Sequence, residues 1–322
     1  MLPMLILAGG MAGAWAWFDQ VRARPGPLPQ ARDIVVPRGG LDQVGAGLTD
    51  AGVVANPIYF RVAVWLSRAE GPLHAAEFAF PAHASLHQVL SILRTARPVV
   101  HHVTIPEGLT AYQIAALLGH ADATNGDVER LEEGSVLPET YAYEYGTARA
   151  VILARARAAM TRELDIAWAA RAPNLPLASP RDALILASIV ERETSRPDER
   201  PHVAAVYLNR LRRGMRLQAD PTVVYGASSG SGTLGHKLTR AELDHDDPFN
   251  TYRNLGLPPG PICAPGLASI RAVMHPADTD DLYFVADGLG GHAFAATREG
   301  HDRNVARWHA LVSGKPAQGS PD

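Results

Sequence analysis

One short pattern occurs three times in the first third of the chain. Each copy is a short apolar stretch that ends at a proline, then a turn, then apolar residues repeated at the spacing of a helix. The copies begin at Val36-Pro37, Phe80-Pro81 and Ile105-Pro106. A strand–turn–helix unit of this size is too small to bury its apolar face alone. We therefore expect small α+β units that pack against one another.

The amino-terminal segment, residues 1–18, carries no charged side chain. As a helix it would span about 27 Å, just enough to cross the hydrocarbon core of a bilayer. We expect a transmembrane anchor here, followed by a Pro-rich linker over residues 19–32. A cleaved signal peptide and a buried core helix are the alternatives. The first arginines, Arg22 and Arg24, follow the segment, and the positive-inside rule alone would place the rest of the chain in the cytoplasm.

The composition argues against several classes of protein. The chain has 322 residues, 47% hydrophobic and 20% charged, which suits about two domains with a sizeable core. Its net charge of -3 argues against a basic field for nucleic acid. The single cysteine, Cys263, excludes an intrachain disulfide and multi-cysteine metal sites, and the histidines include no helix-spaced pair with a glutamate between them. A Gly-rich phosphate-binding loop is also absent. From these observations together we expect no bound metal, no cofactor and no nucleic-acid partner.

The strongest catalytic candidate lies in a helix that begins at Ser179-Pro180, a favourable pair for an N-cap and first turn. Glu191 continues the apolar face of this helix, which is formed by Leu184, Ala187 and Ser188. A carboxyl group at the end of a buried face should resist ionisation, as a general acid near neutral pH must. The sequence therefore predicts Glu191 as a catalytic acid.

A structural ion pair is the alternative role for Glu191. Its candidate partners are Arg210, Arg212 and Arg213. The two residues that follow Glu191, Arg192 and Glu193, are expected to turn toward solvent or the edge of a cleft.

The segments after this helix carry amide, hydroxyl and aromatic side chains of the kind that sugar sites use. The candidate substrate-binding residues are Asn209, Gln218, Asp220, Thr222, Tyr225, Asn250 and Tyr252. Asp220 precedes Pro221, so capping a helix is its alternative role. The prolines and glycines of residues 256–262 predict a rigid loop, which could present Asn250 and Tyr252 to a cleft at low entropic cost.

A set of motifs resembles one family closely. In chain order these are Ile105-Pro-Glu-Gly108, Leu186-Ala-Ser-Ile-Val-Glu-Arg-Glu-Thr194, Asn209-Arg-Leu211, Gly214-Met-Arg-Leu-Gln-Ala-Asp-Pro-Thr222, Asn250-Thr-Tyr252, Gly256-Leu-Pro-Pro-Gly-Pro-Ile262, Tyr283-Phe-Val285 and Gly291-His292. They resemble the endolytic murein transglycosylases of the YceG-like family. Two places depart from the family pattern: Ser135-Val136-Leu137 replaces an aromatic stretch, and Ala264 replaces a residue that is often polar.

The resemblance implies a fold and an activity. The expected fold is α+β, with an N-terminal transmembrane helix over residues 1–18, a LysM-like subdomain over 33–101, a catalytic domain over 102–312 and a flexible tail over 313–322. The expected location is the inner membrane, single-pass, with the catalytic domain on the outer side, because glycan strands exist only there. The expected enzyme is a lyase that cleaves the β-1,4 bond between N-acetylmuramic acid and N-acetylglucosamine. It leaves 1,6-anhydro ends and terminates strand elongation, with Glu191 as the catalytic glutamate.

Two other functions remain open from the sequence. A hydrolytic muramidase would need a second carboxyl group, for which Asp220 is the best candidate. A non-catalytic glycan-binding protein could instead recruit a peptidoglycan synthase, and such synthases are candidate protein partners. Each of the three functions involves peptidoglycan strands and none requires a cofactor.

Overall fold

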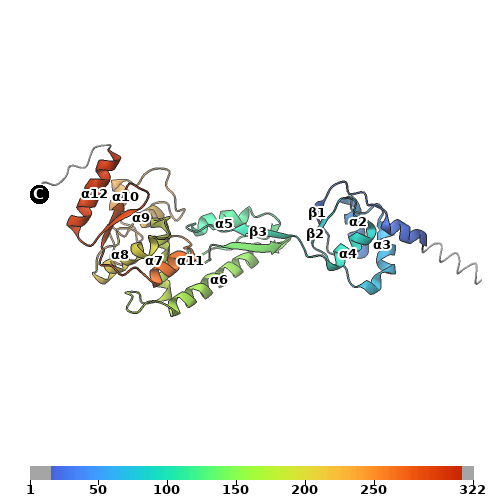
Figure 1. Cartoon of the computed structure of the whole chain (residues 1–322), viewed down its shortest axis with the longest axis horizontal. Coiled ribbons are helices and arrows are strands. Elements are labelled where there is room, and N and C mark those ends of the chain that lie inside the picture. Colours follow the sequence, from blue (N-terminus) through green and yellow to red (C-terminus); the bar gives the residue numbers. More distant parts are fainter. Residues whose placement is uncertain (1–15, 314–322) are drawn as a thin grey trace, which may run out of the picture. The chain divides into compact units, whose positions relative to one another are not determined.

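The computed structural model describes residues 16–313, and the chain divides into two compact units (Figure 1). The first unit takes the described residues up to His102, with Asp122–Thr124 and Ala142–Thr147. The second takes Val103–Ala121, Asn125–Tyr141 and the described residues from Ala148 onward. Helices and strands are both present, so the expected mixed α+β class is confirmed.

The first unit is built on a two-stranded antiparallel sheet. Its elements are β1 (Arg32–Val35), α2 (Leu41–Asp50), α3 (Pro57–Leu66), a 3-10 turn (Arg68–Glu70), β2 (Glu77–Phe80) and α4 (Leu86–Thr95). Strands β1 and β2 pair with Arg32 opposite Phe80. The sheet and the helices enclose a core that includes Ile34, Leu48, Phe60, Phe78, Phe80, Val89 and Leu93.

The threefold repeat forms the predicted local structure. Strands β1 and β2 each end just before the motif's proline, and helices α2 and α4 follow after a turn. The third copy gives β3 (Val100–Thr104) and α5 (Ala111–Gly119). Strand β3 does not join the first sheet but pairs with β5 (Thr140–Glu144), and α5 belongs to the second unit. Only the first two copies therefore share a sheet.

The second unit contains most of the helices. After α5 come β4 (Thr124–Asn125), β5, β6 (Thr147–Ala148), α6 (Arg149–Ala169), α7 (Pro180–Glu193), α8 (Arg200–Arg212), α9 (Asp220–Ala227), α10 (Arg240–Asp244), α11 (Leu267–Met274), β7 (Tyr283–Ala286), β8 (His292–Ala295) and α12 (Arg298–Val312). Strands β7 and β8 form an antiparallel hairpin, which contacts α12.

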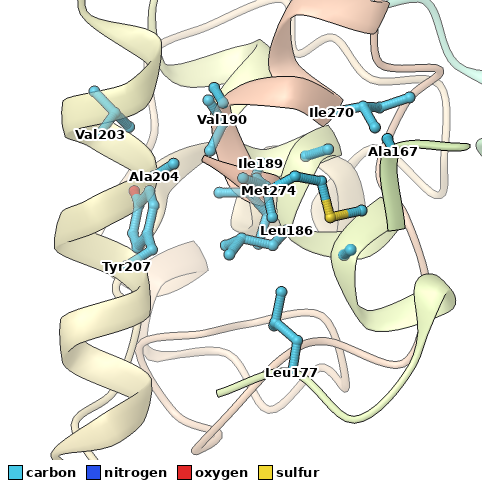
Figure 2. Packing of buried hydrophobic residues seen from close by; sticks show 14 of the residues in the cluster. Ala167, Leu177, Leu186, Ile189, Val190, Val203, Ala204, Tyr207, Ile270 and Met274 are labelled. Atoms are coloured by element: carbon cyan, nitrogen blue, oxygen red, sulfur yellow. The ribbon is translucent and has the colours of Figure 1, made fainter. Parts of the chain in front are cut away.

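The core of the second unit lies where α7, α8 and α11 meet. Figure 2 shows Leu186, Ile189 and Val190 of α7 between side chains of the other two helices. Tyr207 points into this core from α8, and Ile270 and Met274 approach it from α11. This packing fixes the carboxyl end of α7, where Glu191 lies.

The predicted transmembrane helix is not supported by the described part of the chain. Residues 1–15 lie outside the described part of the chain, and no helix within residues 16–313 is long and apolar enough to cross a membrane. The helix that is described at residues 16–23 carries an ion pair between Asp19 and Arg22 (2.6 Å), and its Phe18 is buried in the core of the first unit. This finding corrects the fold prediction, because it does not support an N-terminal transmembrane helix, and it conflicts with the predicted single-pass location in the inner membrane.

Two other predicted segments lie near the ends of the described chain. Within residues 19–32, Leu28 is buried in the first unit and the backbone N–H of Gly26 donates to the carbonyl of His83 (3.1 Å). The tail predicted over residues 313–322 lies outside the described residues, apart from Ser313.

Candidate active site

Glu191 lies in the last turn of α7. The helix begins as the sequence predicts, because the Ser179 hydroxyl accepts a hydrogen bond from the Asp182 N–H and Pro180 occupies the first turn. The face that carries Glu191 is directed into the unit, and Ala187 and Ser188 on it are fully buried. The Glu191 side chain is only 5% exposed. The helical period therefore predicted its direction correctly.

Both carboxylate oxygens of Glu191 accept a hydrogen bond. Arg200, at the start of α8, donates from Nη2 to Oε1 at 2.9 Å. The backbone N–H of Gly266, the N-cap of α11, donates to Oε2 at 2.9 Å. Donors from two helices thus fix the carboxyl group and offset its burial.

The ion-pair partner of Glu191 was not among those expected. Arg210 donates instead to the carbonyls of Leu282 (2.7 Å) and Leu217 (2.5 Å). Arg200 takes the role, and its side chain is 9% exposed. The structural ion pair weighed as an alternative is therefore present, with a different arginine.

A second carboxylate, that of Glu107, lies beside Glu191. Glu107 lies in the turn after β3, and its Oε2 is 3.4 Å from the same Nη2 of Arg200. Its side chain is 44% exposed, so it connects the buried pair to solvent. A methyl group at Gly266 would lie 1.8 Å from Oε1 of Glu107, which shows how closely this carboxylate approaches the Gly266 backbone.

Backbone hydrogen bonds connect the turn that carries Glu107 with the loop that precedes Gly266. The N–H of Gly108 donates to the carbonyl of Ala264 (2.9 Å), and the N–H of Ala264 donates to the carbonyl of Leu109 (2.8 Å). Arg192 adds hydrogen bonds to the carbonyls of Gly108 (3.2 Å) and Gly232 (3.1 Å). Ala264 is therefore fixed through its main chain, whichever side chain stands there.

The rigid loop over residues 256–262 is also anchored to α7. The N–H of Ile262 donates to the hydroxyl of Ser188 (3.0 Å), and the Cys263 thiol donates to the Ser188 carbonyl (3.3 Å). This places the end of the proline-rich loop one helical turn before Glu191. Burial, with a smaller effect of the Glu191 charge, raises the pKa of the Cys263 thiol.

Glu193 does not face solvent, contrary to the expectation. Its Oε1 accepts a hydrogen bond from the hydroxyl of the buried Tyr207 at 2.5 Å. The pKa of Glu193 is raised to about 7, mainly by burial and in part by the charge of Asp220, against lowering by the Tyr207 hydrogen bond and by Arg210. The end of α7 therefore carries two glutamates in different surroundings, one paired with arginine and one bonded to a phenol.

Asp220 and Tyr252, two of the predicted binding residues, are brought together. The Tyr252 hydroxyl donates to Oδ1 of Asp220 at 2.5 Å. Burial and the Asp220 contact raise the pKa of Tyr252. Gln218, two residues before Asp220, has a left-handed backbone (φ 52°) and an exposed side chain. These three residues are reachable by a ligand.

Three other predicted binding residues are engaged inside the protein. The Asn209 amide donates to the carbonyls of Thr279 and Asp281. The Thr222 hydroxyl bonds the Ala219 carbonyl and the Thr251 hydroxyl. The Asn250 amide donates to the carbonyls of Leu243 and His245 (3.0 and 2.8 Å). A substrate-binding role for these residues stays a prediction.

Tyr225, the remaining candidate, contacts a glutamate that the sequence did not single out. Its hydroxyl donates to Oε2 of Glu133 at 3.2 Å, and the Ala111 N–H donates to the same carboxylate. Burial raises the pKa of Glu133, against lowering by these hydrogen bonds. Glu133 lies two residues before the departure at Ser135-Val136-Leu137. In the part of the chain that the structure describes, no group of three or more His, Cys, Asp or Glu side chains is placed to hold a metal ion.

Sequence and structure comparisons agree on one family. Two relatives are named endolytic murein transglycosylase: the Streptococcus pneumoniae R6 protein is 28% identical over 94% of this chain, and the Bacillus subtilis 168 protein is 32% identical over 56% of it. The chain spans 63% of the first relative's length and 49% of the second's. The crystal structure of a putative YceG-like protein from Listeria monocytogenes matches with a TM-score of 0.50 and 27% identity, covering 85% of this chain and 99% of that one. Because the YceG-like family profile matches residues 34–307, the chain belongs to the YceG-like family.

Proposed function

We propose that this protein is a lytic transglycosylase that cleaves the glycan strands of peptidoglycan, with Glu191 as the catalytic residue. The observation that carries the proposal is the fixed carboxyl group of Glu191, which Arg200 and the Gly266 N–H hold from two sides. Support comes from relatives named endolytic murein transglycosylase. A carboxyl group fixed by its surroundings suits proton transfer, since that step needs a defined geometry.

In the first step, Glu191 in its acid form gives its proton to the glycosidic oxygen. The bond from that oxygen to the anomeric carbon breaks, and the departing sugar leaves as an alcohol instead of an alkoxide. The carboxyl group becomes a carboxylate. The guanidinium of Arg200, 2.9 Å from Oε1, stabilises the negative charge that forms.

In the second step, the carboxylate of Glu191 accepts the proton of the sugar's own C6 hydroxyl. The C6 oxygen bonds to the anomeric carbon, and Glu191 returns to its acid form. No water is consumed, and the attacking oxygen is already tethered, so the step gains effective molarity. One carboxyl group can thus serve both steps.

The proposal extends to the bond cleaved, the product and the sugar contacts. We propose the β-1,4 bond between N-acetylmuramic acid and N-acetylglucosamine as the bond cleaved and 1,6-anhydro ends as the product, so that cleavage ends strand elongation. Gln218, Asp220, Tyr225 and Tyr252 are proposed as contacts to the sugars because their side chains are not fully buried. Residues 33–101 are proposed as a LysM-like subdomain that holds the strand.

The test is a cleavage assay on purified glycan strands with matched variants. Glu191→Gln keeps the shape of the side chain but cannot act as an acid, so cleavage should fall by roughly 10²–10⁴-fold. Glu299→Gln, an exposed glutamate on α12, should cleave like the wild type. Folded Glu191→Gln protein that cleaves at the wild-type rate would overturn the assignment, and a wild type that binds strands without shortening them would favour the non-catalytic alternative.

One observation favours hydrolysis as a second candidate. The carboxylate of Glu107 shares Arg200 with Glu191, and a neighbouring pair of carboxyl groups is what a muramidase uses. Asp220, the partner expected from the sequence, is instead bonded to Tyr252. The two reactions are separated by their products, because hydrolysis creates new reducing ends.

A further inference from the structure

Arg200 offers a single nitrogen to two carboxylates. Its Nη2 lies 2.9 Å from Oε1 of Glu191 and 3.4 Å from Oε2 of Glu107. Its Nε is buried and has no hydrogen-bond partner in the described structure. The guanidinium therefore keeps one donor unused, and turning that donor toward either carboxylate would strengthen its hold on that group.

Gly266 contacts the same two carboxylates. The N–H of Gly266 donates to Glu191, and the space where a side chain would begin is occupied by the Glu107 carboxylate. Glu107 thus packs directly against the backbone that fixes Glu191. Two acidic groups and one buried cation at such short range must influence each other's charge.

We propose that Glu107 is a positioning residue that divides Arg200 between two carboxylates, so that Glu191 can exchange between its acid and carboxylate forms during the reaction. The inference rests on the proposed function. With Glu107 charged, Arg200 is shared and the carboxylate form of Glu191 is stabilised only in part. Without the charge on Glu107, Arg200 would act on Glu191 alone and hold it as a carboxylate, which cannot protonate the substrate.

The other charged or titratable groups near Glu191 do not supply this effect. Arg192, next to it on α7, is bound to two backbone carbonyls. Cys263, in the loop before α11, stays a neutral thiol because burial raises its pKa. Glu133 is bonded to Tyr225, and Asp220 at the start of α9 acts on Glu193. Glu107 is the carboxylate that shares the cation of Glu191.

The experiment measures the pH dependence of kcat/KM for strand cleavage in Glu107→Gln. Removing a negative charge beside Glu191 should move the alkaline limb of the profile about one unit toward acid pH, while activity well below the limb is retained. Glu107→Asp keeps the charge and should stay closer to the wild type. Arg200→Gln removes the cation and should move the limb in the opposite direction. Glu299→Gln is the matched control and should leave the limb in place.

Each other result would overturn the inference. An alkaline limb that does not move in folded Glu107→Gln would show that Glu107 does not tune Glu191. Loss of cleavage at every pH in that variant would show that Glu107 takes part in the chemistry itself. Because Glu107 is 44% exposed, its amide variant should fold, and melting temperature checks this. Failure of the proposed function shows separately, as full cleavage by Glu191→Gln.

Discussion

The guanidinium of Arg200 lies 2.9 Å from Oε1 of Glu191, and both side chains are less than one-tenth exposed. Removing one partner from a buried pair leaves the other charge uncompensated, which is more costly than losing an exposed pair. Here the two removals are not equivalent, because Arg200 has a second carboxylate and Glu191 has no second cation in contact with it among the described residues.

We therefore expect Arg200→Met to lower the free energy of unfolding by about 3 kcal/mol. Glu191→Gln should lower it by less, since Arg200 keeps Glu107 as a partner. Denaturant unfolding of the two variants measures the difference. Equal losses would show that the contact with Glu107 does not compensate Arg200.

Glu193 makes the stability of the fold depend on pH. Its pKa is about 7 in the folded protein against 4.5 as a reference, so the unfolded chain loses its proton first as pH rises. The contribution of Glu193 is present in full below about pH 4.5 and is lost as pH rises toward 7, by no more than about 3 kcal/mol. Glu193→Gln should flatten this part of the stability curve. Denaturant unfolding between pH 4.5 and 7 measures this dependence. If the free energy of unfolding of Glu193→Gln falls with pH as steeply as that of the wild type, Glu193 is not the group responsible.

Gly266→Ala should disturb the site through Glu107. The added methyl group would lie 1.8 Å from Oε1 of Glu107, and the exposed side chain would move away from Arg200. We expect reduced cleavage in Gly266→Ala and a smaller further loss when the same change is made in a Glu107→Ala background. Gly235→Ala is the control, because a methyl group there meets nothing within 4 Å. If Gly266→Ala lowers cleavage equally in the wild-type and Glu107→Ala backgrounds, the substitution does not act through Glu107.

Asn250→Ala should weaken the fold. Asn250 is buried, and its amide donates to the carbonyls of Leu243 and His245, which would be left without this donor. We expect a loss of about 2 kcal/mol in the free energy of unfolding. Gln218→Ala, at an exposed side chain, should leave stability nearly unchanged. A stable Asn250→Ala protein with a raised KM would instead show that the amide serves the substrate.

The local structure could be predicted well from the sequence. Ser179-Pro180 marks the start of α7 because capping depends on a few adjacent residues. The inward direction of Glu191 follows from the helical period of its own helix. The strand–proline–turn–helix units are also local, and the strands and helices lie where the pattern predicts.

The partners of Glu191 could not be predicted in the same way. Arg200 reaches it from the next helix and Glu107 from a turn far earlier in the chain, so both contacts depend on how the elements pack. A signal for Glu107 was present in the Ile105-Pro-Glu-Gly108 motif, which was interpreted as a turn and as part of the family resemblance, without a role for Glu107 itself. Glu193 was misjudged because helical spacing alone does not show that Tyr207 of α8 covers that side of α7.

The chemistry of the new chain ends tests the proposed role of Glu191 more directly than any other measurement. Wild-type protein should be incubated with purified glycan strands in ¹⁸O-labelled water, and the products analysed by mass spectrometry. If Glu191 accepts the proton of the sugar's own C6 hydroxyl, the new ends are 1,6-anhydro ends without ¹⁸O, and Glu191→Gln produces almost none. New reducing ends that carry ¹⁸O would contradict this mechanism, because they would show that water, not the C6 hydroxyl, attacks the anomeric carbon.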